Sequence, residues 1–279
     1  HLTCEKFLGV QTPKRVDYLR VIIMELARIS DHLICNSIVG VDTGAYTGFL
    51  YVMQYRELIY EIYEEVCGSR LTTNIGRIGG FERNFTNTAF EKLEKFLKEY
   101  PKVLKEFENL FARNRIFMER TIGGGAISAE RALNYGFTGP NLRAAGVDYD
   151  VRVHQPYSSY QDFDFTIPVG KTGDNYDRFL VRNEEMWQSL SIIEQAYKKV
   201  QEFNRQSNGH KLTVTEVIRL KKKLLDPNRK TRYKILAKQF GVSMMALQRI
   251  KTGENWGHIK VEFPEKPVIK EQDYDNKTR

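Results

Sequence analysis

Asp42 is the residue of this sequence whose type and setting could most directly do chemistry. It lies in a Val-Asp-Thr-Gly-Ala run at 41–45, between two stretches with helical periodicity. A partly buried carboxylate can have a shifted pKa and can relay a proton. The same residue type is also a common helix cap. The sequence therefore leaves two interpretations of Asp42 open, a proton-transfer group and a simple cap.

Other charged residues gather before and after this position. Glu25, Arg28 and His32 fall near one face of the first helical stretch. A single histidine in such a place more often packs in a core than acts as a ligand, so the structural interpretation of His32 is favoured. Arg77 stands two residues before a pair of glycines. The permissive backbone there could bring a guanidinium close to a ligand, and an ordinary salt bridge is the alternative.

The elements that would position these side chains are helices. Apolar residues recur every three or four positions in several long stretches, and Pro101 would break one of them. The predicted long helices are 16–39, 48–67, 88–100, 102–120 and 182–203. Ser128 is the predicted N-cap of a short helix that ends at Gly136, and 137–175 is predicted to be ordered loop with short extended pieces. The expected fold class is mainly α.

Composition and cysteine spacing exclude several classes of protein. The chain has 279 residues, of which 41% are hydrophobic and 28% charged, an ordinary globular balance. No apolar run reaches the ~18–20 residues of a membrane span. Cys4, Cys35 and Cys67 form no CxxC pair, so we expect no zinc site, no disulfide framework and a reducing compartment. The sequence begins at His1 and shows no secretory signal, as we expect of a fragment or a processed form.

The last quarter of the chain differs from the rest in charge. Residues 205–279 hold 18 Lys and Arg against 8 Asp and Glu, while the whole chain has a formal net charge of +8. Such asymmetry predicts two units with different partners, although a solvated basic tail would give the same count. We expect a first domain at 1–204, a linker at 205–210, a second domain at 211–259 and a flexible tail at 260–279.

Three short basic helices are predicted in the second domain, at 213–225, 233–240 and 244–251. A tight turn separates the last two, which is the helix-turn-helix pattern whose final helix enters the major groove of DNA. The side chains expected to approach bases are Ser243, Met245, Gln248 and Arg249, and those expected to contact phosphates are Lys221, Lys222, Lys230, Lys234 and Lys251. The alternative is a basic three-helix bundle that binds no ligand.

Short motifs distributed over residues 1–203 resemble one known family. They include Glu-Lys-Phe-Leu-Gly at 5–9, Glu-Leu-Ala-Arg at 25–28, Asp-Thr-Gly-Ala at 42–45, Gly-Ser-Arg at 68–70, Arg-Ile-Gly-Gly at 77–80, Tyr-Gly-Phe-Thr-Gly-Pro at 135–140, Tyr-Asp-Val-Arg at 149–152 and Val-Arg-Asn-Glu-Glu-Met at 181–186. Their order and spacing are similar to those of the D subunit of NADH-quinone oxidoreductase, which lies at the quinone site of respiratory complex I.

This resemblance implies a fold, a substrate and a set of partners. The family is related in fold to the large subunits of nickel–iron hydrogenases, with a helical core and a loop-rich segment, but it carries no metal. It implies a peripheral position on the cytoplasmic side of the bacterial inner membrane, next to the membrane arm and to an iron–sulfur subunit that holds the terminal cluster. Quinone is the substrate, its reduction is coupled to proton translocation, and partner subunits handle NADH and the iron–sulfur clusters.

Individual site residues are also implied by the resemblance. Asp42 matches the family aspartate in the proton network near the quinone headgroup, and Arg77 matches an arginine close to the terminal cluster. A fixed positive charge there would favour the reduced cluster. Thr47, Phe49 and Met53 lie where the wall of the quinone cavity is expected.

Two departures from the family pattern change what we expect. Thr72 stands where many members have a histidine, five residues before the arginine. A neutral hydroxyl cannot gain a proton on reduction, so we expect a cluster of lower potential, suited to menaquinone. The sequence also begins inside the family pattern and lacks its quinone-facing tyrosine and its C-terminal segment, so we expect this fragment alone to be inactive.

Residues 211–259 resemble a different family, the helix-turn-helix modules at the ends of phage-type homing endonucleases. The run Arg-Ile-Lys-Thr-Gly-Glu-Asn-Trp at 249–256 is part of that likeness. The histidines have no paired catalytic spacing, so we expect no nuclease. This resemblance implies duplex DNA as a partner. It leaves an alternative function, that of a DNA-binding protein fused to a non-catalytic fragment of the D subunit.

Overall fold

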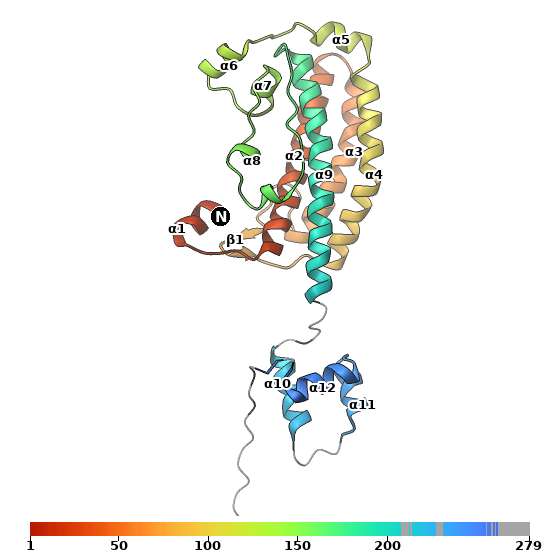
Figure 1. Ribbon diagram of the computed structural model, residues 1–279. Coiled ribbons are helices and arrows are strands. Elements are labelled where there is room, and N and C mark those ends of the chain that lie inside the picture. The colour runs from red at the N-terminus through yellow and green to blue at the C-terminus, as the bar shows by residue number, and fades with distance from the viewer. Residues whose placement is uncertain are drawn as a thin grey trace, which may run out of the picture. The chain divides into compact units, whose positions relative to one another are not determined.

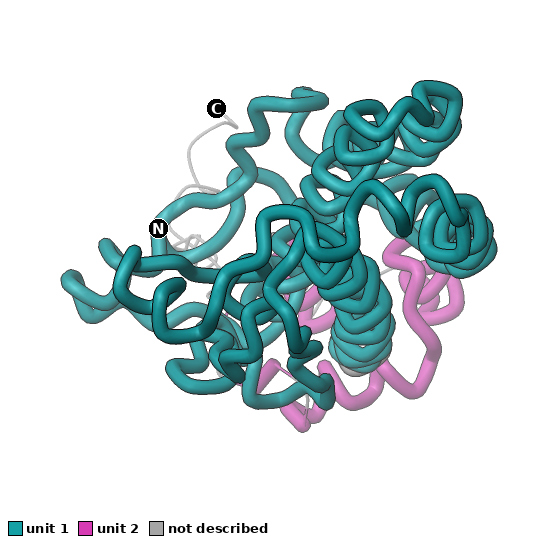
Figure 2. Tube along the Cα trace, turned by 90° about the horizontal axis from the view of Figure 1, so that it is seen from above, with its two compact units in different colours: residues 1–203 teal, residues 204–279 magenta. Residues whose placement is uncertain are grey.

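The computed structural model describes residues 1–207, 212, 214–226, 231–254, 256–257, 259 and 261. The chain divides into two compact units, His1–Phe203 and Asn204–Arg279, which Figure 2 shows in two colours. Among the described residues, each unit buries a hydrophobic core of its own.

Four long helices lie side by side and form the body of the first unit (Figure 1). They are α2 (Lys14–Asp42), α3 (Tyr46–Cys67), α4 (Asn87–Phe111) and α9 (Asn175–Ser207). Aromatic rings join them in the core, where Phe107 and Phe111 of α4 have ring centroids 5.8 and 6.2 Å from that of Phe179 in α9. The helices predicted at 16–39, 48–67 and 182–203 are confirmed, and each extends beyond its apolar pattern.

The prediction of two helices broken at Pro101 is wrong. Helix α4 continues through Pro101 to Phe111, and the break comes later, before α5 (Arg115–Thr121). Proline removes one backbone hydrogen bond, but the apolar stripe is buried on both sides of it, with Tyr100 and Leu104 fully buried. Burial of this stripe holds the helix together. The chain turns at Asn114, whose side chain accepts hydrogen bonds from two amides of α5.

Short elements complete the first unit. They are α1 (Leu2–Leu8), the antiparallel pair β1 (Gly76–Arg77) and β2 (Gly80–Phe81), α6 (Ala129–Asn134), α7 (Gly139–Ala144), α8 (Val151–His154) and the 3-10 turn η1 (Tyr160–Asp162). The cap at Ser128 is confirmed, since its Oγ accepts from the amide of Arg131. The segment 137–175 contains short helices where extended pieces were predicted.

Three helices make up most of the described part of the second unit. They are α10 (Val214–Leu225), α11 (Tyr233–Gln239) and α12 (Met244–Thr252), each within one residue of its prediction. Ser243 caps α12, as predicted, by accepting a hydrogen bond from the amide of Ala246 at 3.1 Å. The apolar side chains that meet between the helices are Leu212, Val217, Leu220, Leu224, Leu236, Ala237, Leu247 and Ile250.

The start of the predicted linker at 205–210 is helical, because α9 continues to Ser207. No glycine or proline lies between Gly173 and Gly209, and adding a residue to a long helix costs far less than starting one. Residues 208–210 and Lys230 lie outside the described residues. So does the predicted tail at 260–279, apart from Val261.

Candidate functional site

Asp42 is the last residue of α2, and its side chain is exposed at the junction between α2 and α3. The N-cap of α3 is Ala45, which makes no capping hydrogen bond. Asp42 therefore does not cap α3, and the simple-cap interpretation loses its structural basis. What remains is an exposed carboxylate at the end of a buried helix.

A set of short contacts fixes the backbone of this junction. The Thr43 hydroxyl donates to the carbonyl of Gly40 at 2.9 Å, and the amide of Ala45 donates to the same carbonyl at 2.8 Å. Arg120 of α5 donates from Nη1 to the carbonyl oxygen of Thr43 at 2.5 Å. The junction thus carries a guanidinium one residue from Asp42, which sequence spacing did not predict because Arg120 is 77 residues from Thr43.

Two glycines let α2 and α3 approach α4 beside the junction. A Cβ atom on Gly40 would lie 2.8 Å from Cζ of Phe111, and one on Gly48 would lie 2.8 Å from Cε2 of the same ring. Real Cβ atoms do not come so close to other atoms. The Phe111 ring therefore occupies the space that side chains at these two positions would fill, and it sets the distance between the helices.

The three predicted wall residues lie in the first two turns of α3. Thr47 is exposed, while Phe49 and Met53 are half-buried and lie one turn apart. Exposed apolar side chains are found in the same part of the unit: Tyr46 (61% exposed), Leu50 (53%) and Leu110 (44%). This end of the helix bundle therefore presents apolar side chains together with the Asp42 carboxylate.

Arg77 lies at the other end of the bundle. It is in the β1–β2 hairpin, and Figure 1 shows β1 and α5 at opposite ends of the long helices. Arg20 of α2 contacts the backbone of Arg77. Arg20 and Asp42 are 22 residues apart on α2, or about 33 Å at 1.5 Å per residue. The structure therefore does not bring Asp42 and Arg77 together.

The Arg77 guanidinium is held by local partners. Its Nη1 donates to the side-chain oxygen of Asn74 at 3.0 Å and to the carbonyl of Gly76 at 2.9 Å. Its Nη2 forms an ion pair with Glu82. The side chain is 43% exposed, so the salt bridge leaves part of the guanidinium open to a partner.

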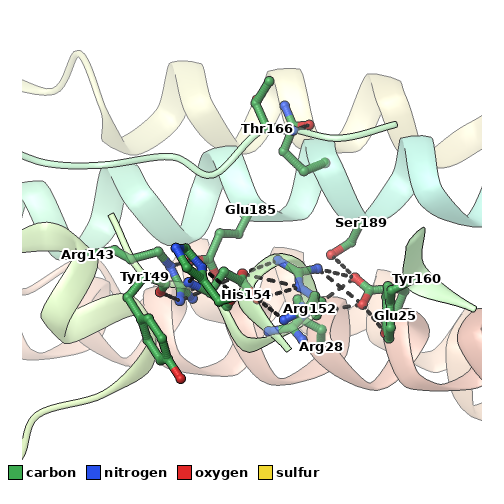
Figure 3. A network of polar contacts seen from close by, with 12 residues as sticks. Glu25, Arg28, Arg143, Tyr149, Arg152, His154, Tyr160, Thr166, Glu185 and Ser189 are labelled. Carbon is green, nitrogen blue, oxygen red and sulfur yellow. Dashed lines mark hydrogen bonds and ion pairs between the residues drawn. The ribbon is translucent and has the colours of Figure 1, made fainter. Parts of the chain in front are cut away.

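A buried network of charged side chains connects α2, α9 and the segment that runs from α7 through α8 to η1 (Figure 3). Nη1 of Arg152 lies 3.1 Å from Oε2 of Glu25, and Nη2 of Arg152 lies 2.7 Å from Oδ2 of Asp150. Glu25 also accepts hydrogen bonds from the hydroxyls of Tyr160 and Ser189, both at 2.6 Å. Buried charges require such partners, since an unpaired one is very costly.

These partners lower the pKa of the buried carboxyl groups. Burial works to raise the pKa of Asp150, but the hydrogen bonds and charge of Arg152 outweigh it and bring the pKa to about 2. Burial also opposes ionisation of Glu25, yet the charges of Arg28 and Arg152 hold its pKa below the ordinary value. Both carboxylates are therefore ionised at neutral pH.

His32 lies at the other end of the network. Its Nε2 is 2.6 Å from Oε2 of Glu185, and Arg143 lies 2.5 Å from Oε1 of the same carboxylate. Burial works to raise the pKa of Glu185, but contacts with His32 and Arg143 lower it. His32 has the buried, paired setting of a structural residue. The arginines were not predicted, because their partners are far away in the sequence.

Among the described residues of the second unit, the predicted DNA-contacting side chains are exposed, with one exception. The exposed residues are Ser243, Met245, Gln248, Arg249, Lys251, Lys222 and Lys234. Lys221 is buried, and its Nζ donates to the carbonyls of Trp256 at 2.7 Å and of Ile259 at 2.8 Å. The prediction that Lys221 contacts phosphate is therefore wrong, because its ammonium group is used inside the unit.

Within the described part of the chain, no three His, Cys, Asp or Glu side chains are arranged to hold a metal ion. No described helix is both long and apolar enough to cross a membrane.

Residues 42–260 match the family model of the respiratory-chain NADH dehydrogenase 49 Kd subunit. The chain belongs to this family. The matched region begins at Asp42 and includes the described helices of the second unit. The comparisons give no support to the DNA-binding resemblance of 211–259.

Curated relatives are similar to this chain over about 70% of its length. A D subunit of NADH-quinone oxidoreductase from Cytophaga hutchinsonii, numbered 2 in that organism, is 74% identical over 200 residues, which cover 72% of this chain and 51% of the relative. The D subunit of Flavobacterium johnsoniae is 72% identical over 199 residues, 71% of this chain and 48% of the relative. The D subunit of Leptospira biflexa is 54% identical over 194 residues, which cover 70% of this chain and 48% of the relative. The chain thus spans about half the length of the curated relatives it matches.

Proposed function

We propose that this chain is part of the D subunit of an NADH-quinone oxidoreductase and contributes to its quinone-reduction site. The observation that carries the proposal is the 74% identity over 200 residues to the NADH-quinone oxidoreductase relative from Cytophaga hutchinsonii. The activity belongs to the complex, so this chain alone is inactive. The partners are the iron–sulfur subunit with the terminal cluster and the membrane arm, on the cytoplasmic side of the bacterial inner membrane.

The α2–α3 junction is the proposed place for the quinone. Apolar side chains around Phe49 and Met53 suit an apolar substrate, and Thr47 adds a hydroxyl. Quinone that has received electrons needs protons on its oxygens. Asp42 serves this need as a proton-transfer group. Arg120 positions the backbone next to it.

Arg77 is proposed to face the terminal iron–sulfur cluster of the partner subunit. Its guanidinium is partly exposed on the β1–β2 hairpin, and a positive charge there favours the reduced cluster. Thr72 lies in the loop before it and cannot take up a proton. This favours a low-potential quinone such as menaquinone. Arg20, which contacts the backbone of Arg77, is about 33 Å from Asp42 along α2. The proposal therefore has Asp42 and Arg77 at two ends of an extended site.

The test uses the full-length subunit assembled in its complex. Asp42→Asn keeps the size and hydrogen-bonding capacity of the side chain but cannot exchange a proton. We expect NADH-to-quinone turnover to fall by about 10²-fold or more. Turnover from NADH to ferricyanide, which bypasses the quinone, stays at the level of the unmodified complex.

The matched control is Asp31→Asn, the same change at an exposed position of the same helix. It leaves quinone turnover unchanged. Wild-type turnover in Asp42→Asn would contradict the assignment of Asp42.

A second candidate function is DNA binding by the second unit, with the first unit as a non-catalytic fragment. The observation that favours it is the exposure of Gln248 and Arg249 on α12, after a short turn that follows α11. Lys222, Lys234 and Lys251 are exposed cations that could contact phosphates.

Fluorescence anisotropy of the full chain with a labelled DNA duplex tests this candidate. We expect binding that weakens steeply with salt. Arg249→Ala should reduce sequence preference more than Lys222→Ala does. Lys98→Ala, an exposed position of α4, is the control and leaves binding unchanged. Salt-independent binding, or an equal effect of the control, would exclude this function.

A further inference from the structure

Glu5 and Arg20 form a buried ion pair beneath the β1–β2 hairpin. Nη1 of Arg20 lies 2.7 Å from Oε2 of Glu5, and Nη2 lies 2.6 Å from Oε1, so the pair is bidentate. The two residues are 5% and 7% exposed. Bidentate pairing fixes the direction of the guanidinium as well as its distance from the carboxylate.

The same two side chains also hold the backbone of the hairpin. Oε1 of Glu5 accepts a hydrogen bond from the amide of Gly79 at 2.7 Å. Nη2 of Arg20 donates to the carbonyls of Arg77 at 2.9 Å and Gly80 at 3.2 Å. The pair therefore contacts three of the four residues from Arg77 to Gly80.

The hairpin needs such support. Its strands are two residues long each, and Gly79 has a φ of +85°. Isolated two-stranded hairpins are marginal even when they are longer. Among the described residues, β1 and β2 form a sheet of two strands only. Contacts from α1 and α2 must therefore supply the stabilisation that additional strands would give in a larger sheet.

The pair is poorly suited to a purely stabilising role. Taking two charges out of water offsets much of their attraction. Nε of Arg20 is buried without a hydrogen-bond partner, which adds to that cost. What the pair provides is a defined position for the hairpin backbone.

We propose that Glu5 and Arg20 are positioning residues that hold the hairpin so that the Arg77 guanidinium faces the partner's cluster. The inference rests on the function proposed for Arg77. Two of the acceptors of that guanidinium, the carbonyls of Asn74 and Gly76, belong to the same backbone. If the hairpin shifts, the guanidinium shifts with it.

The experiment uses the full-length subunit in its complex, with Arg20→Lys and Glu5→Gln. A lysine cannot pair with both carboxylate oxygens and donate to two carbonyls from a rigid fork. A glutamine keeps one acceptor oxygen but loses the charge. Arg143→Lys is the control, because it makes the same change at a buried ion pair elsewhere in the unit.

Two properties are measured. Hydrogen exchange of the peptide that covers residues 76–82 reports the hairpin, and a redox titration followed by electron paramagnetic resonance reports the midpoint potential of the terminal cluster. We expect exchange at least ~10-fold faster in Arg20→Lys and Glu5→Gln, since a hydrogen bond to a charged group is lost or weakened. We expect the potential to fall in the same direction as in Arg77→Ala, and Arg143→Lys to change neither property.

The double variant Arg20→Lys with Arg77→Ala completes the test. If Arg20 acts through Arg77, the midpoint potential of the cluster in the double variant is no lower than in the Arg77→Ala variant alone. Unchanged hairpin exchange in both single variants, or an additional fall in the double variant, would overturn the positioning role. An unchanged potential in Arg77→Ala, with faster hairpin exchange in Arg20→Lys, would instead overturn the function proposed for Arg77.

Discussion

At the scale of single residues, the position of the Phe111 ring explains why two neighbouring helix positions are glycine. Its edge occupies the positions where Gly40 and Gly48 would carry a Cβ atom. Helix propensity alone favours alanine over glycine by up to ~1 kcal/mol in a helix interior. At these two positions steric overlap outweighs propensity, since neither the ring nor the helix backbone can move away freely.

Gly48→Ala should therefore destabilise the protein by about 1–3 kcal/mol, the usual cost of overpacking. The measurement is the free energy of unfolding in urea. Gly80→Ala is the matched control, since a Cβ there would meet no atom within 4 Å. A gain in stability for Gly48→Ala would show that propensity prevails and that the ring adapts.

At the scale of elements, local pattern predicted more than contacts across the chain. The apolar stripes of α2, α3 and α9 were sufficient to locate these helices. Burial on both sides of Pro101 is a tertiary effect, so the break predicted there was wrong. Lys221 was predicted to be exposed and to contact phosphate, although it lies four residues after Val217, on the buried face of α10. That spacing could have revealed its inward position.

The candidate site was predictable only in part, for a related reason. Asp42 stood out because a carboxylate and a glycine follow a helical stretch. Arg120, which holds the backbone beside it, is distant in sequence and has no local signal. The partners of Glu25 are equally remote, since Arg152 is 127 residues away.

The buried network should make stability depend on pH in acid. The pKa of Asp150 is about 2 in the folded chain and 3.8 ordinarily. The unfolded chain therefore takes up the proton first as the pH falls. The contribution of Asp150 to the free energy of unfolding is thus fully present above about pH 4. Between pH 4 and pH 2 this contribution to the free energy of unfolding declines by about 2 kcal/mol.

Asp150→Asn tests this dependence and keeps a residue that can cap α8. Urea unfolding between pH 6 and pH 2 should show a large difference from the unmodified chain at pH 6 and a small one at pH 2. Asp31→Asn, at an exposed position, serves as the control. A difference that stays constant with pH would mean that Asp150 does not act through its charge.

At the scale of the whole molecule, the largest core cluster of the first unit and the core cluster of the second unit share no residue among those described. A chain shortened to residues 1–207 should keep the urea unfolding midpoint of the first unit. The full chain should show this transition and a second one. Circular dichroism of both chains makes the comparison. A shifted midpoint in the shortened chain would reveal that the second unit supports the first.

The buried network also bears on the order in which the first unit folds. Glu25 and Glu185 belong to α2 and α9, while Arg143 and Arg152, which pair with them, lie on the segment that contains α7 and α8. Until that segment docks, Glu25 and Glu185 lack their buried arginine partners, and His32 and Arg28 alone do not replace them, so both carboxylates keep part of their hydration. We therefore expect the long helices to associate first, with water between α2 and α9. Docking of Arg143 and Arg152 then expels this water in a late, slow step, since closing so long a loop costs entropy before any contact forms.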